Sequence, residues 1–157
     1  MATLKRPLED GGIYHILSRG VDKRKIFVEN NDYFRFIHNL YEFNNDKPTV
    51  NNNRSFSRLI DPRRDPSAPL ATSLTRRNII TEILCFCLMP NHYHLLLRAI
   101  SRAGLVKFLS RLNTGYAKYF NEKYQRSGAL FQSRYKLIPI VNEAHFVHIP
   151  YYIHYSL

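Results

Sequence analysis

The feature that most constrains the fold is a pair of apolar segments separated by only three residues. Residues 78–88 read NIITEILCFCL and residues 92–99 read HYHLLLRA, with Met89-Pro90-Asn91 between them. Both segments are apolar enough to be central strands of a sheet. Because so short a link joins neighbouring strands as a hairpin, we predict an antiparallel pair in the middle of the domain.

The spacing of apolar residues predicts two more strands and three helices. The strands cover residues 13–19 and 136–141, and the helices cover residues 30–45, 101–124 and 143–155. This order favours an α+β fold. We expect a ferredoxin-like sandwich, a mainly antiparallel sheet with helices packed on one face.

The helical segments also predict which side chains face the core. In the helix over residues 30–45 the expected stripe is Phe34, Ile37, Leu40 and Tyr41. In the helix over residues 101–124 it is Leu105, Leu109, Leu112 and Tyr116. In the last strand Pro139 indicates an edge position or an irregularity.

The 157 residues are enough for one domain, and we expect residues 1–157 to form a single domain with one insertion. Residues 46–77 hold four of the eight prolines and seven basic residues against three acidic ones. This composition predicts a mobile surface insertion. No apolar run approaches the length of a membrane-spanning helix, so no membrane association is expected.

The charge balance indicates the kind of partner. Lys and Arg number 23 against 12 Asp and Glu, which gives a formal charge of +11. A nucleic acid is the expected partner, ahead of an anionic membrane surface. The only cysteines, Cys85 and Cys87, are at strand spacing in an apolar segment, which indicates reduced, buried thiols and a cytoplasmic location.

Two histidines on one predicted strand form a candidate metal site. Strand side chains alternate between faces, so His92 and His94 point the same way, with Tyr93 on the other face. Such a pair can bind a divalent metal, or it can be hydrogen-bonded or solvent-facing without one. A zinc set with Cys85 and Cys87 is a further alternative, although its spacing is unlike that of usual zinc sites.

The region after this strand is basic and aromatic. Between Ser101 and Lys136 there are eight basic residues and a single acidic one, Glu122, interleaved with tyrosines and phenylalanines. Basic groups bind phosphates, and exposed aromatic rings can stack on unpaired bases. A metal beside a nucleic-acid groove suggests phosphoryl transfer, and a tyrosine can serve as the nucleophile.

Five segments together resemble a known family. They are YHILSRG with KRKIF, LMPNHYHLLL, TGYAKYFNEKYQRSGALFQSRYK and YYIHYSL. In this order they resemble the single-tyrosine HUH transposases, which include the IS200-like and REP-associated tyrosine transposases. The match runs through nearly the whole chain, and residues 46–77 are covered poorly.

The resemblance implies a ferredoxin-like enzyme that cuts and rejoins single-stranded or hairpin DNA through a 5′-phosphotyrosine. It implies Mg²⁺ or Mn²⁺ bound by His92 and His94, and it makes Tyr152 the nucleophile. It also implies a homodimer in which one subunit can complete the site of the other. Tyr151 and Tyr116 are the competing tyrosines: Tyr151 would point about 100° away on a helix, and Tyr116 lies on the expected apolar stripe.

The chain departs from the family near its last residue. Ser156 stands where the family usually has Asn or Gln, the following proline is absent, and the sequence stops at Leu157. This indicates a shortened chain or a decayed or repurposed copy. Helical spacing puts His148 and Ser156 on the face of Tyr152, so both are candidates for metal binding or proton transfer.

Charge and position suggest seven DNA contacts: Arg19, Lys23, Arg24, Lys107, Arg111, Lys118 and Arg134. Two other functions stay open. The first is a non-catalytic protein, domesticated or truncated, that binds hairpin DNA. The second is a zinc-stabilised RNA-binding domain that uses Cys85 and Cys87.

Overall fold

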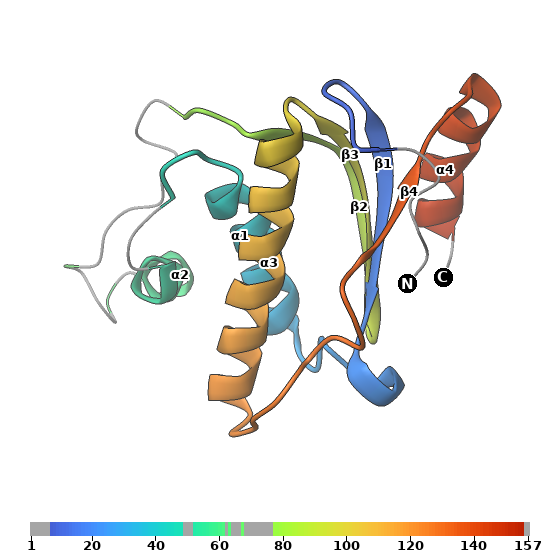
Figure 1. Cartoon of the computed structure of the whole chain (residues 1–157). Coiled ribbons are helices and arrows are strands. Elements are labelled where there is room, and N and C mark those ends of the chain that lie inside the picture. The colour runs from blue at the N-terminus through green and yellow to red at the C-terminus, as the bar shows by residue number, and fades with distance from the viewer. Residues whose placement is uncertain (1–6, 49–51, 62, 64–66, 68–76, 156–157) are drawn as a thin grey trace.

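The computed structural model describes residues 7–48, 52–61, 63, 67 and 77–155 (Figure 1). The elements, in chain order, are β1 (Ile13–Arg19), a 3₁₀ turn η1 (Val21–Lys23), α1 (Asn30–Phe43), α2 (Asn52–Ile60), β2 (Thr81–Met89), β3 (His92–Ala99), α3 (Arg102–Lys123), β4 (Lys136–Pro139) and α4 (Glu143–Tyr155). Every predicted strand and helix is present, within a few residues of its predicted bounds. The turn η1 and the helix α2 were not predicted.

The four strands form one antiparallel sheet in the order β2-β3-β1-β4. This is the strand order of a ferredoxin-like fold, and β4 is an edge strand as Pro139 predicted. The prediction that residues 78–88 form a central strand is wrong, because β2 is the other edge. Its side chains are apolar on both faces because helices cover both: Leu88 joins the core under α1 and α3, and Cys87 packs near α4.

The two faces of the sheet are covered unequally (Figure 1). Helices α1 and α3 cover one face, as expected, and the main core lies beneath them, with Tyr93, Leu95 and Leu97 of β3 fully buried. Helix α4 lies against the opposite face, where a smaller cluster centres on Leu96 and Ile149. The polar residues of β3 therefore lie on the face of the sheet that α4 partly covers.

The buried face of α1 differs from the predicted stripe. Phe34 and Ile37 are 57% and 42% exposed, so the prediction that they face the core is wrong. Leu40 is buried as predicted, and Phe36 and Asp32 are buried with it. These three residues are spaced i, i+4 and i+8 on one helix face. The position of Asp32 explains this rotation of the helix.

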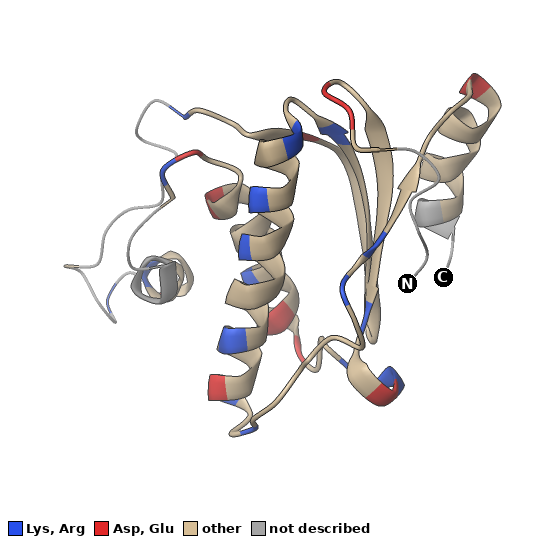
Figure 2. Cartoon of the chain, viewed as in Figure 1, with Lys and Arg blue, Asp and Glu red and all other residues tan. Residues whose placement is uncertain are grey.

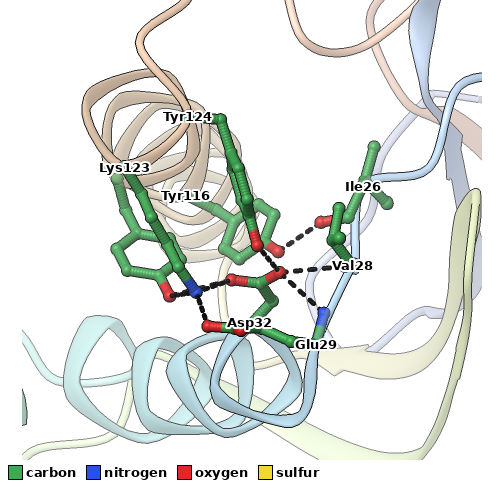
Figure 3. A network of polar contacts seen from close by, with 8 residues as sticks. Ile26, Val28, Glu29, Asp32, Tyr116, Lys123 and Tyr124 are labelled. Carbon is green, nitrogen blue, oxygen red and sulfur yellow. Dashed lines mark hydrogen bonds and ion pairs between the residues drawn. The ribbon is translucent and has the colours of Figure 1, made fainter.

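Asp32 is fully buried and accepts five hydrogen bonds (Figure 3). The donors are the backbone N–H groups of Val28 (2.9 Å) and Glu29 (3.1 Å), Tyr119 Oη (2.9 Å), Lys123 Nζ (2.7 Å) and Tyr124 Oη (2.6 Å). Burial alone would raise the pKa of Asp32. The hydrogen bonds, that from Lys123 first, outweigh it, and the pKa is lowered. This network fixes the start of α1 against the end of α3.

The short helix α2 falls within the segment that we predicted as a mobile surface insertion. Its Phe56 is buried, and the guanidinium of Arg35 on α1 lies 5.1 Å from the centre of that ring. Phe56, Leu59 and Ile60 are at helical spacing, but the prolines and polar residues of the segment favoured a loop. In the part of the chain that the structure describes, no helix is long and apolar enough to cross a membrane.

Candidate active site

Strand β3 presents His92 and His94 on the face that α4 covers. Their ring centroids are 5.0 Å apart and the ring planes are nearly perpendicular, at 80°. His94 lies opposite Leu17 of β1 and Cys87 of β2, and His92 lies opposite Arg19 and Met89. Tyr93 points to the other face, where its hydroxyl donates to Asn113 Oδ1 at 2.6 Å. The core therefore fixes the rotation of the strand that carries the two histidines.

Each histidine ring contacts a second polar residue through Nδ1. Asn91 Oδ1 lies 2.6 Å from Nδ1 of His92. His15 Nε2, from β1, lies 2.9 Å from Nδ1 of His94, and both of these rings are buried. His15 was not among the site residues predicted from the sequence. Strand alternation could have placed it on one face of β1, but only the register against β3 brings it beside His94.

The surroundings keep these imidazoles neutral. The pKa of His94 is lowered to about 4, first by burial and then by the nearby charges of His15, His92 and Arg19. Burial and Arg19 lower the pKa of His92, and burial and His145 lower that of His15. A neutral imidazole has a free lone pair, which is the form that binds a metal. Two neutral imidazoles on neighbouring positions of one rigid strand fit a divalent ion as two of its ligands.

The described residues contain no group of three or more His, Cys, Asp or Glu side chains arranged to hold a metal. His148 therefore does not complete a set with His92 and His94, and Ser156 lies outside the described residues. Burial raises the pKa of the Cys85 and Cys87 thiols, which disfavours the thiolate that zinc requires. The zinc interpretation thus loses its support in the described part of the chain.

Tyr152 is the tyrosine that lies beside the histidine pair. Helix α4 begins after Asn142, whose side chain accepts the N–H of His145 at 2.7 Å. The ring of Tyr152 is 6.0 Å from that of His94, nearly perpendicular to it, and 56% exposed. Tyr116, a residue of α3, is fully buried, and its hydroxyl donates to the carbonyl of Ile26 (Figure 3). The core position argues against Tyr116 as a nucleophile.

Four of the predicted DNA contacts belong to segments at the His92 end of the sheet. Arg19 pairs with His92 across the strands, and η1, which contains Lys23 and precedes Arg24, follows it directly. The backbone of residues 19–21 is hydrogen-bonded to residues 130–132, just before Arg134. Lys136, which was not among the predicted contacts, lies opposite Leu17 in the row that contains His94.

The other three predicted contacts are on α3. This helix and α4 lie on opposite faces of the sheet (Figures 1 and 2). Lys107 pairs with Asp46 at 3.3 Å. Arg111 donates to the backbone carbonyls of Asn45 and Asp46 at 2.9 and 3.2 Å. Both residues tie α3 to the segment after α1, and Lys118 is exposed. The structure does not bring these three together with the histidine pair.

Comparisons with known proteins identify the family and a similar fold. Residues 72–156, more than half of the chain, match the family described as IS200-like transposases. A solved structure described as a REP-associated tyrosine transposase bound to a REP hairpin is similar, with a TM-score of 0.55 and 14% identity. The similarity covers 99% of this chain and 72% of that chain.

A second solved structure, of a candidate transposase from Deinococcus radiodurans R1, has a TM-score of 0.47 and 15% identity, covering 98% of this chain and 95% of that chain. No curated protein matches the chain. The strand with the two histidines and the helix with Tyr152 both lie within the matched residues. The chain belongs to the IS200-like transposase family.

Proposed function

We propose that the protein is a metal-dependent DNA transposase that cleaves and rejoins single-stranded or hairpin DNA through a 5′-phosphotyrosine on Tyr152. The observation that carries this proposal is the position of Tyr152, whose ring lies 6.0 Å from that of His94. Two imidazoles and one accessible tyrosine on the same side of the sheet are the groups that this chemistry needs.

His92 and His94 would hold Mg²⁺ or Mn²⁺, which when bound polarises the scissile phosphate. The hydroxyl oxygen of Tyr152 attacks the phosphorus and forms the new O–P bond. The bond from phosphorus to the 3′ oxygen breaks, and that oxygen takes up the proton that the tyrosine loses. Rejoining is the reverse, in which a 3′-hydroxyl displaces the tyrosine, so no external energy source is needed.

The basic residues at the same end of the sheet would bind the DNA backbone. Arg19 lies across from His92, and Lys136 lies in the row of His94, so both can bind phosphates next to the scissile one. Hairpin DNA is the favoured substrate because the similar solved structure is described as bound to a REP hairpin. We also propose a homodimer, as the resemblance to the family implies.

The test is an adduct assay with labelled single-stranded hairpin DNA and Mn²⁺, read on a denaturing gel. The wild-type protein should form a covalent protein–DNA species that Tyr152→Phe and His92→Ala do not form. Tyr151→Phe is the matched control, because it removes a neighbouring exposed hydroxyl from the same helix and should leave the adduct intact. An adduct that survives Tyr152→Phe would refute the assignment of the nucleophile.

A second candidate is a non-catalytic protein that binds hairpin DNA. It is favoured by the observation that the described residues contain no group of three or more His, Cys, Asp or Glu side chains that could hold a metal ion. In the same assay this candidate predicts hairpin binding on a native gel and no adduct from the wild type at any Mn²⁺ concentration.

A further inference from the structure

An imidazole that binds a metal must present an unprotonated nitrogen, so its other nitrogen carries the proton. Which nitrogen that is depends on the hydrogen-bond partner of the ring. In this site the partners are known for both rings, since His92 contacts Asn91 and His94 contacts His15, in each case through Nδ1. The two contacts therefore bear on which nitrogens are free.

The partner of His92 is an acceptor. Asn91 Nδ2 points to the carbonyl of Lys23 at 3.5 Å, which orients the amide so that Oδ1 faces His92. The backbone carbonyl of Asn91 also accepts the N–H of Gly20 at 2.9 Å, so the turn is held from both sides. An amide oxygen can only accept, so Nδ1 of His92 is the donor and Nε2 has the free lone pair.

The partner of His94 is a second imidazole. His15 is 4% exposed and His94 is 3% exposed, so their facing nitrogens are paired with each other and not with bulk water. One of the two nitrogens must donate and the other accept. If Nδ1 of His94 donates to Nε2 of His15, then Nε2 of His94 is free to bind a metal. In the opposite arrangement Nε2 of His94 carries the proton and cannot.

We propose that His15 and Asn91 are positioning residues that hold His92 and His94 in the same tautomer, with Nδ1 protonated and Nε2 available to the metal. This inference rests on the proposed function, because it assumes that the histidine pair binds a divalent cation. It assigns a role to His15, which comes from a different strand and lies next to the pair only because of the β1–β3 register.

The experiment measures Mn²⁺ binding by calorimetry in the absence of DNA. His15→Leu, which removes the acceptor, should weaken Mn²⁺ binding by about 10- to 100-fold. His15→Gln should restore most of the affinity, because its side-chain oxygen can accept from Nδ1 of His94. Asn91→Ala should weaken binding in the same direction. His94→Ala is the reference and should abolish binding at this site.

Two outcomes have separate meanings. If His94→Ala binds Mn²⁺ as the wild type does, the proposed metal site itself is wrong. If His94→Ala abolishes binding while His15→Leu binds as tightly as the wild type, only the role of His15 is refuted. A purely structural role would lower the unfolding temperature of His15→Leu and His15→Gln without separating their Mn²⁺ affinities.

A measurement on the wild type does not depend on any variant folding. Two-bond ¹H–¹⁵N correlation spectra distinguish the two neutral tautomers of a histidine. Both His92 and His94 should show the form protonated at Nδ1. A spectrum with His94 protonated at Nε2 would overturn the proposal.

Discussion

Two polar clusters on opposite sides of the sheet differ in how completely they are satisfied. On one side the two oxygens of Asp32 accept five hydrogen bonds, from α3 and from the start of α1 (Figure 3). On the other side, within the described chain, the bonds at the histidine pair involve Nδ1 of both rings and none involves Nε2. A buried polar group with every partner in place is a structural device, whereas a held ring with a free nitrogen can bind a ligand.

The largest expected effect is the loss of DNA cleavage when the histidine pair is changed. His94→Ala should give no detectable DNA adduct, yet lower the free energy of unfolding by only about 1–3 kcal/mol, because it leaves one buried partner, His15, unpaired. Urea unfolding and the adduct assay together check this. A loss of stability large enough to unfold the protein would show that the histidines are primarily structural.

Changes at Asp32 should have the opposite effect, a loss of stability with little effect on metal binding. Asp32→Ala removes the acceptor of five hydrogen bonds and leaves Lys123 and two tyrosine hydroxyls without that partner. We expect the free energy of unfolding to fall by about 3–5 kcal/mol, with Mn²⁺ affinity unchanged in the protein that remains folded. Urea unfolding followed by calorimetry at low temperature measures both. A weakened Mn²⁺ affinity in folded protein would mean that the two clusters are coupled.

The pH dependence of stability sharpens the same contrast. The pKa of Asp32 is lower in the folded protein than its ordinary value of 3.8. The charged carboxylate therefore stabilises the fold above that value, and this contribution is lost as the pH falls from about 4 through the folded pKa. Chemical denaturation between pH 5 and 2 should show a steeper loss of stability for the wild type than for Asp32→Asn. Equal slopes would contradict this prediction.

The smallest effects concern two basic residues on opposite sides of the sheet. Arg19→Ala should weaken hairpin binding and lower the salt slope of the affinity by about one, because Arg19 lies beside His92. Lys107→Ala should leave both nearly unchanged, because Lys107 is paired with Asp46 on the far side of the sheet. Fluorescence anisotropy over a range of salt concentrations measures both, and equal slopes for the two variants would remove the distinction.

The sequence predicted the elements that depend on local periodicity. The strand that carries the two histidines, the helix that carries Tyr152 and the ferredoxin-like order all follow from apolar spacing and turn residues. The rotation of α1 could not be predicted, because the buried carboxylate of Asp32 depends on hydrogen bonds from Lys123 and Tyr124. These residues lie some ninety positions later in the chain. Contacts of this kind leave no periodic signal in the sequence.

The site shows the same limit. Strand alternation was enough to place His92 and His94 on one face. To predict the position of His15, one needs the register between β1 and β3. To predict the ion pair of Lys107, one needs the path of the chain after α1. From charge alone, Lys107 and Arg111 were predicted to contact DNA. Their bonds to residues 45–46 could not be predicted in this way.

The unequal covering of the sheet has a consequence for how the molecule opens. Strand β3 lies inside the sheet under the main core, whereas Ile149 is the one buried side chain among those described for α4. Segments with few buried apolar contacts open at lower free energy than the core does. Native-state hydrogen exchange should therefore proceed first in α4 and last in β3, so that the tyrosine-bearing helix can leave the sheet while the histidine strand stays folded.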